Sequence, residues 1–98
     1  MTPEARVKKR VCIVLKELGA YYATLVQASA PDFLVCWRGK FFGVECKASG
    51  DKPTALQEKN MKEIREAGGH AIAIDENNVD QLGSWVRGHE YEWRSTKS

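Results

Sequence analysis

The segment from Asp32 to Ala48 contains two apolar runs separated by a short polar stretch, and it constrains the fold more than any other part of the chain. The runs 32–37 and 41–48 are rich in aromatic and β-branched residues, which favour β-strands. Residues 38–40 between them have the right length for a hairpin turn. The sequence therefore predicts two antiparallel strands that pair about residue 39.

Helix and strand signals precede this hairpin. Thr2 and Pro3 are typical of a helix start, and apolar residues then recur at helical spacing until Gly19. The run 21–27 has strand composition, and residues 28–31 end in a proline that favours a turn or a strand entry. We expect one helix and one strand before the hairpin.

Similar signals follow the hairpin. Thr54 and Gln57 match the capping-box pattern of a second helix that ends at a glycine pair, residues 68–69. Residues 70–74 form a short apolar strand, and apolar residues between 79 and 86 recur at helical spacing. The predicted order is helix, three strands, helix, strand, helix.

This order predicts an α/β fold with a mixed sheet flanked by helices. Short turns make the first three strands antiparallel, and the helical crossover makes the fourth strand parallel to the third. The length of 98 residues fits one domain, 1–98, with a core of about 3–87 and a polar tail, 88–98, in which Tyr91 and Trp93 are candidate docking points.

The chain shows no apolar stretch long enough to cross a membrane and no signal-peptide core at its N-terminus, so we expect a cytoplasmic protein. Its cysteines, Cys12, Cys36 and Cys46, are odd in number and form no Cys-x-x-Cys pair. They are expected to be small buried hydrophobic residues in a reducing compartment. Zinc ligands at the usual spacing are absent from the sequence.

The net charge of +2 is too small to indicate a polyanion partner, but the charge is unevenly distributed. Residues 6–10 carry four positive charges in five positions. Most of these side chains should form a solvated basic patch, which by itself indicates only solubility. The patch becomes a phosphate-binding surface if a nucleic-acid site lies beside it.

Glu45 and Lys47 stand in the most strand-like segment of the chain. Strand side chains alternate, so the two share a face and lie about 6.6 Å apart along the strand. That separation suits two groups that flank one small object, such as a metal ion with its bound water. The alternative is an ordinary half-exposed sheet face, since a buried charge without a partner costs several kcal/mol.

Three further residues favour a site. Asp32, which is otherwise an ordinary turn residue after proline, should lie near Glu45 across the hairpin. Glu4, otherwise explained by the helix dipole, falls on the inward stripe of the first helix. Gln57 either closes the capping box or faces the same site. Two carboxylates suit Mg²⁺ or Mn²⁺, and Lys47 can orient the attacking water and neutralise phosphate charge.

Pro31 and Asp32, followed after twelve residues by Glu45, Cys46 and Lys47, resemble the signature of the restriction-endonuclease-like nuclease superfamily. More narrowly, the chain resembles the virus-type replication–repair nuclease (VRR-NUC) family over roughly residues 4–86. The matching features are Glu4, Ala30, Pro31, Asp32, the hairpin 37–42, Glu45, Cys46, Lys47, Gln57 and the segment 67–69.

The resemblance implies roles for these residues. Asp32 and Glu45 would bind the catalytic Mg²⁺ or Mn²⁺ with the backbone carbonyl of Cys46, and Lys47 would be the catalytic lysine. Glu4 and Gln57 would support the site. The basic residues expected to contact DNA are Lys8, Lys9, Arg10, Arg38, Lys40 and Lys52.

The resemblance further implies a structure-specific endonuclease that cuts branched DNA such as four-way (Holliday) junctions. Small members of the family act as homodimers, because two strands need two sites related by a two-fold axis, and many come from phages. Aromatic residues in surplus of a small core support a dimer here: Trp37, Phe41, Trp85 and Trp93.

Other functions stay open at this point. The chain can be a DNA-binding or assembly module without cleavage, a nuclease of flaps, nicks or general DNA, or a small structural domain with coincidental charges.

The chain also departs from the family pattern at two positions. Ser29 stands where members often carry glycine, and Cys46 replaces a more usual aliphatic residue.

Overall fold

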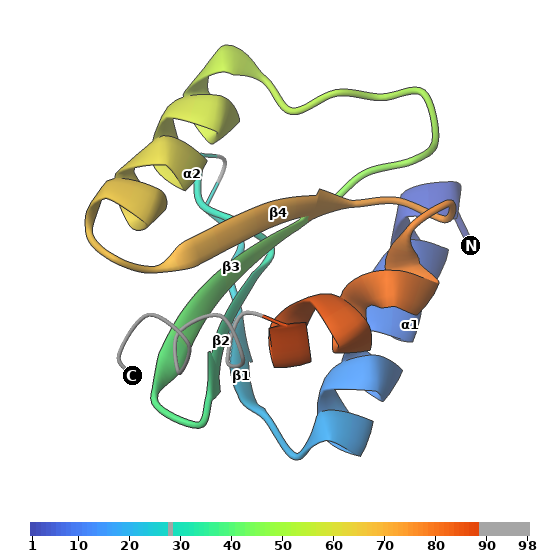
Figure 1. The fold of residues 1–98 in the computed structure, drawn as a ribbon. Helices are drawn as coiled ribbons and strands as arrows, with labels where there is room; N and C mark the ends of the chain where they lie inside the picture. The colour runs from blue at the N-terminus through green and yellow to red at the C-terminus, as the bar shows by residue number, and fades with distance from the viewer. Residues whose placement is uncertain (28, 89–98) are drawn as a thin grey trace.

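The computed structural model describes residues 1–27 and 29–88, and its described part is a four-stranded mixed sheet flanked by helices (Figure 1). The α/β fold class and the order of elements predicted from the sequence are confirmed. The elements are α1 (Pro3–Leu18), β1 (Tyr21–Thr24), β2 (Phe33–Trp37), β3 (Lys40–Cys46), α2 (Ala55–Glu66), β4 (His70–Ile74) and the 3₁₀ turn η1 (Val79–Gln81), followed by helical residues 82–88.

The sheet has the order β1-β2-β3-β4, with β1, β2 and β3 antiparallel and β4 parallel to β3, as expected. The β2–β3 turn is shorter than predicted. Trp37 pairs with Lys40, so only Arg38 and Gly39 form the turn and the pairing centres between them. Both have positive φ, 49° and 78°, which matches the twist that two-residue hairpins require.

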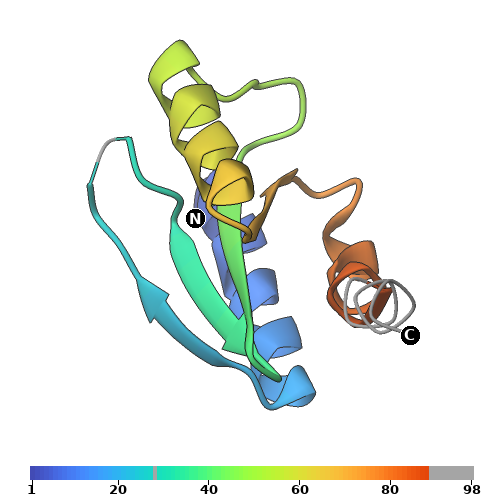
Figure 2. The same cartoon turned by 60° about the vertical axis from the view of Figure 1, so that its left-hand side comes forward.

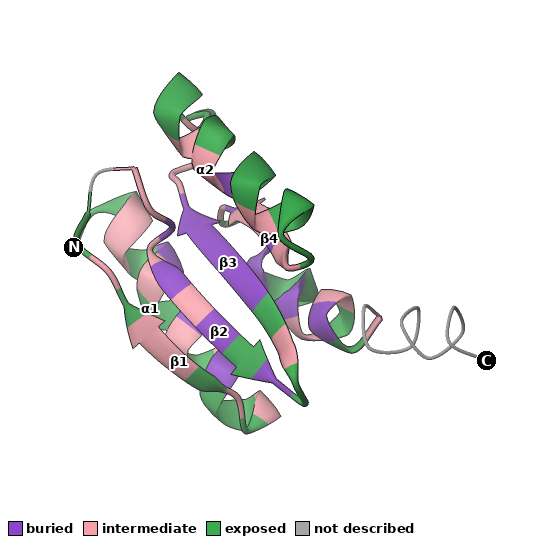
Figure 3. Ribbon diagram, turned by 90° about the vertical axis from the view of Figure 1, so that its left-hand side faces the viewer, coloured by how far each residue is buried: buried purple, intermediate pink, exposed green. Residues whose placement is uncertain are grey.

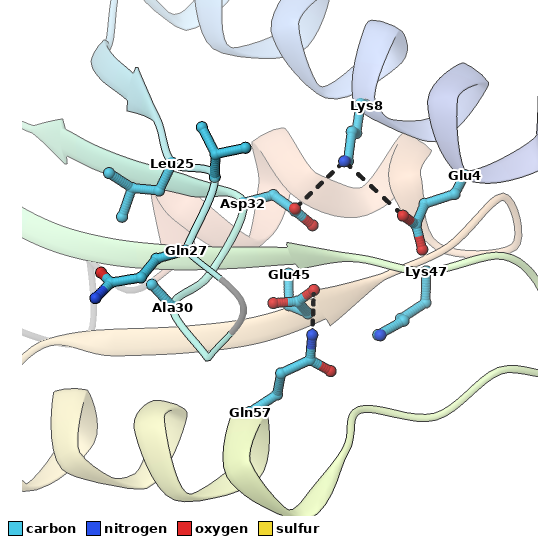
Figure 4. Close-up of a pocket in the computed structure, with 10 residues that line it drawn as sticks. Glu4, Lys8, Leu25, Gln27, Ala30, Asp32, Glu45, Lys47 and Gln57 are labelled. Carbon is cyan, nitrogen blue, oxygen red and sulfur yellow. Dashed lines mark hydrogen bonds and ion pairs between the residues drawn. The ribbon is translucent and has the colours of Figure 1, made fainter.

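Two strand boundaries also differ from the prediction. β1 ends at Thr24 rather than at residue 27, and β3 ends at Cys46 rather than at Ala48. The backbone N–H of Leu25 still donates to the carbonyl of Asp32 at 2.9 Å, whereas residues 26, 27 and 29–31 lie outside the sheet. Pro31, at the end of this segment, has no N–H to donate to a strand ladder. The loop that results lies beside the C-terminal end of β3 (Figure 4).

One face of the sheet carries the hydrophobic core. Phe42, Val44 and Cys46 of β3 are fully buried beneath α1 and the segment 79–88. α1 contributes the apolar stripe that its sequence predicts and is capped as expected, with Thr2 Oγ1 accepting from the N–H of Ala5. Its inward-facing residues are Val7, Val11 and Leu15.

α2 covers the other face of the sheet, but only over β3 and β4 (Figures 1 and 2). It approaches β3 closely at Gly43, where an added Cβ would lie 2.8 Å from Ile64 Cδ1 and 3.0 Å from Pro31 Cγ. A side chain at this position would therefore require Ile64 or Pro31 to shift, so glycine allows α2 to pack at its present height above the sheet.

Part of the face that α2 leaves uncovered is exposed, near the β2–β3 hairpin (Figure 3). Tyr21, Cys36 and Phe41 are directly paired across β1, β2 and β3, and all three are exposed. We call these three residues the open sheet face. The prediction that every cysteine is buried is thus wrong for Cys36, because no described helix lies over this part of β2.

The other predictions about cysteines and aromatic residues have mixed outcomes. Cys46 is buried and Cys12 is half-buried. Trp37 was expected to exceed what the core can bury, but it is only 8% exposed and donates from Nε1 to the carbonyl of Leu18 at 3.0 Å. Trp85 also packs against the core. The expected tail falls outside the described residues apart from Gly88, and so do Tyr91 and Trp93.

In the described part of the chain, none of the helices has the length and apolar character that a membrane crossing requires.

Candidate active site

An open pocket of about 220 Å³ lies where β3 ends and α1 and α2 begin (Figure 4). Each helix presents its first turns to the pocket, and the loop before β2 closes another side. Polar and charged side chains dominate its lining. The lining residues are Glu4, Lys8, Leu25, Val26, Gln27, Ala30, Asp32, Glu45, Lys47 and Gln57. All five residues predicted to carry or support catalysis are among them.

Asp32 precedes β2 and reaches across to the end of β3. Its Oδ2 accepts a hydrogen bond from the backbone N–H of Cys46 at 2.8 Å, and its Oδ1 lies 3.4 Å from Lys8 Nζ. The predicted position of Asp32 beside residues 45 and 46 is therefore confirmed. The hydrogen bond to the backbone fixes the carboxylate toward the pocket rather than toward solvent.

Glu45 is the only charged or polar residue among the described residues that is fully buried, at 3% exposure. Its Oε2 accepts from Gln57 Nε2 at 3.3 Å, while Oε1 is buried without a hydrogen-bond partner among the described residues. Burial, followed by the negative charge of Asp32, raises the pKa of Glu45 to about 7, although Lys47 lowers it. The alternative of a half-exposed sheet face is wrong for Glu45.

Lys47 follows β3 directly and lines the pocket on the same side as Glu45 (Figure 4). Its backbone N–H donates to the carbonyl of Ile74 at 2.8 Å, which extends the parallel pairing with β4 by one residue. This bond fixes the backbone from which the side chain projects, and the residue as a whole is half-exposed.

Gln57 both closes the capping box of α2 and faces the site, the two roles that the sequence left open. Its Oε1 accepts from the backbone N–H of Thr54 at 2.9 Å, and the side chain of Thr54 caps Gln57 in return. Its Nε2 simultaneously donates to Glu45. The capping box therefore orients the amide that holds the buried carboxylate.

Glu4 and Lys8 lie one helical turn apart on α1, and both face the pocket. Lys8 Nζ is 3.8 Å from Glu4 Oε2 and nearer to Asp32. Although burial lowers it, these two carboxylates raise the pKa of Lys8 overall. The prediction had placed Lys8 in a solvated basic patch. The i, i+4 spacing from Glu4 was the sequence signal that both residues share one face of the helix.

The rest of the basic patch behaves as expected. Lys9 and Arg10 are exposed on α1, and Arg10 forms an ion pair with Asp80 of η1. Lys52 is exposed in the loop that follows β3. None of these three residues is among those that line the pocket.

Arg38 and Lys40 lie elsewhere. They belong to the β2–β3 hairpin, at the opposite end of β3 from Glu45, about 17 Å away along the strand. The Arg38 guanidinium lies over the ring of Trp37, at 4.9 Å from its centroid. The structure therefore does not bring these two predicted DNA contacts to the pocket.

The donor groups of the pocket fit a hard divalent cation. The described residues contain no set of three histidine, cysteine or acidic side chains arranged to hold a metal. Mg²⁺, however, is commonly bound by one or two carboxylates with several waters. Asp32 and Glu45 supply two carboxylates, and the buried Oε1 of Glu45 has no hydrogen-bond partner among the described residues. A cation would compensate that oxygen.

The thiol of Cys46 is not part of this donor set. Its side chain is fully buried in the core, and burial raises its pKa. Cys46 can therefore contribute only its backbone carbonyl to a metal, and its substitution for an aliphatic residue leaves the pocket unchanged. The same side chain fills a core position beside Val44.

Comparison with known proteins finds a structural match but no sequence match. No family profile and no curated protein sequence matches the chain. A solved structure described as a VRR_NUC domain matches with a TM-score of 0.70 and 28% sequence identity, over 84% of this chain and 95% of the other. Together with the order of the motifs, this match supports the assignment of the chain to the VRR-NUC family of nuclease domains.

Proposed function

We propose that this chain is a Mg²⁺- or Mn²⁺-dependent endonuclease that hydrolyses phosphodiester bonds in DNA. The observation that carries the proposal is the buried Glu45, which lines the pocket with Asp32 and Lys47 and whose Oε1 has no hydrogen-bond partner among the residues that the structure describes. A buried carboxylate without compensation is costly, so its retention points to a cation that binds there. The fold match to a VRR_NUC domain supports the same function.

The residues of the pocket take distinct roles in this proposal. Asp32 and Glu45, with the carbonyl of Cys46, hold the metal, and Gln57 keeps Glu45 oriented. A divalent metal held there would supply Lewis-acid polarisation of the phosphate and a lowered pKa for its bound water. Lys47 orients the attacking water and offsets the charge that develops on the phosphate.

DNA is the polyanion that the surroundings of the pocket favour. Lys9, Arg10 and Lys52 are exposed, and we expect them to contact DNA phosphates outside the pocket. Such contacts position a backbone without reading its sequence. A structure-specific nuclease needs this kind of binding, since its target is a shape rather than a base sequence.

Branched DNA, such as a four-way junction, is the substrate that we propose, and a homodimer is the form that would cut it. A junction needs two symmetric incisions, which two copies related by a two-fold axis supply. The open sheet face of Tyr21, Cys36 and Phe41 supports this proposal, because it offers aromatic surface that one chain leaves uncovered. It lies away from the pocket, so both sites would stay accessible.

The test is incubation of the protein with labelled duplex, nicked, flap and four-way-junction DNA, with Mg²⁺, Mn²⁺ or EDTA. The proposal predicts metal-dependent products, and most of them from the junction. Binding without products on any DNA would instead indicate a non-catalytic DNA-binding module of the same fold. Equal cutting of all substrates would keep the nuclease and remove the junction preference.

Lys47→Ala should retain junction binding and lose at least about a hundredfold in cleavage, because stabilisation of transition-state charge is commonly worth that much. Lys62→Ala is the matched control, since it removes an exposed lysine of α2 outside the pocket lining. Binding is measured by gel shift in Ca²⁺ or EDTA, and cleavage in Mn²⁺. Unchanged cutting by Lys47→Ala would remove this residue from the mechanism.

A further inference from the structure

A second lysine besides Lys47 enters the pocket, and it lies directly against a carboxylate that the proposed function assigns to the metal. Lys8 Nζ is 3.4 Å from Asp32 Oδ1 and 3.8 Å from Glu4 Oε2 (Figure 4). The backbone N–H of Cys46 occupies the other oxygen, Oδ2, of Asp32. Lys8 therefore faces the oxygen that is left for an additional partner.

The charge of the pocket requires such a partner. Glu4, Asp32 and Glu45 bring three carboxyl groups to one small space, and Asp32 is only 19% exposed. Among the cationic side chains that line the pocket, Lys8 has ion pairs with two of these carboxylates. In a partly buried site such pairs are worth more than they are on an open surface.

A divalent cation and the ammonium of Lys8 are competitors for the same oxygen. Two positive charges a few ångströms apart repel each other strongly at the low effective dielectric constant of a partly buried site. The lysine has a long flexible stem, and its side chain is 42% exposed, so it can turn toward solvent without disturbing α1.

We propose that Lys8 is the internal counter-ion of Asp32 in the metal-free protein, and that it releases this carboxylate when a divalent cation binds. Lys8 is thus a positioning residue that holds Asp32 toward the pocket and sets the affinity for the metal. This inference rests on the proposed function only in taking Asp32 as a metal ligand.

The first test measures Mn²⁺ binding without DNA, by electron paramagnetic resonance of the free ion. Lys8→Met keeps the length of the side chain and removes its charge, so it should bind Mn²⁺ about tenfold more tightly than the unaltered protein. Lys9→Met removes the neighbouring exposed charge and should change the affinity less than about twofold. Lys8→Arg, which restores a cation, should return the affinity toward that of the unaltered protein.

Two results would overturn the inference, and they can be told apart. If the unaltered protein binds Mn²⁺ and Lys8→Met binds it equally well or more weakly, the proposed role of Lys8 is wrong. The metal site itself would stand. Absence of Mn²⁺ binding in all four proteins would reject the metal site, and the inference and the proposed function with it.

A second test uses the unaltered protein and does not depend on the folding of any variant. An amine-reactive reagent should label Lys8 slowly without metal, because the ion pair with Asp32 holds its ammonium. Addition of Mg²⁺ should raise the labelling rate of Lys8 several-fold and leave that of Lys9 unchanged, as read by tandem mass spectrometry. Equal rates for Lys8 with and without Mg²⁺ would contradict the proposed release.

Discussion

At the scale of single residues, the pocket depends on side chains that satisfy more than one demand. Gln57 closes the capping box of α2 and donates to Glu45 with the same amide. Asp32 accepts from the backbone of β3 and faces Lys8 with its other oxygen. Because each contact constrains the next, the carboxylates are oriented before any ligand binds.

Glu45 gives a pH dependence of stability with a definite sign. Its pKa is raised from 4.5 to about 7 in the folded protein, so the folded state holds this proton more tightly than the unfolded state does. The free energy of unfolding of the metal-free protein should therefore fall as pH rises from about 4.5 to about 7, by up to about 3 kcal/mol.

Glu45→Gln cannot titrate and should lack this contribution. Urea unfolding in EDTA at about pH 5 and about pH 8 measures the difference, with Glu58→Gln on the exposed side of α2 as the control. Parallel pH dependences for the unaltered protein and Glu45→Gln would show that burial of this carboxylate has no such cost.

Most residues of the pocket could be predicted from the sequence, because an error of one residue in the strand register does not separate them. Asp32 and Glu45 stay neighbours whether the hairpin turn has two or three residues, since each lies near a strand end. The contact of Lys8 with Asp32 was not predicted, because four cations in five residues resemble a solvated patch and only Lys8 of the four lines the pocket. Local pattern does not reveal which one.

At the scale of elements, the position of α2 above β3 is the arrangement that brings Gln57 to Glu45. Gly43 sets the height of the helix, because any Cβ there would contact Ile64 and Pro31 at 3.0 Å or less. The site and the packing of α2 are therefore linked through one glycine.

Gly43→Ala should destabilise the protein by about 1–3 kcal/mol, since it adds volume to a closely packed contact. Gly83→Ala is the control: the atom nearest to its added Cβ is the movable end of Arg87, at 3.2 Å. Alanine is also favoured there, because residues 82–88 are helical. Chemical denaturation measures both, and equal stability of the two variants would contradict the close approach of α2.

The order of helices and strands could be predicted from the sequence. The extent to which α2 covers the sheet could not. Periodicity shows that a strand has two faces, but it does not show how far a helix extends over one of them. Cys36 was expected to be buried for this reason. It lies on the face that α2 covers, beyond the edge of that helix, and is exposed.

At the scale of the whole molecule, the open sheet face is the surface that we expect to join two copies. Phe41→Lys places a charge in this face and should convert a dimer into a monomer, as measured by light scattering. Ile13→Lys is the control, because Ile13 is similarly exposed, 49% against 43%, but belongs to α1 on the other side of the sheet. A monomeric unaltered protein, with and without junction DNA, would exclude the proposed dimer.

The most direct measurement of the central claim is anomalous diffraction from crystals soaked in Mn²⁺. The account predicts one strong peak in the pocket, bonded to oxygens of both Asp32 and Glu45, with Lys47 at its edge. Crystals that show Mn²⁺ only elsewhere, or an Asp32 side chain that points away from Glu45, would contradict it.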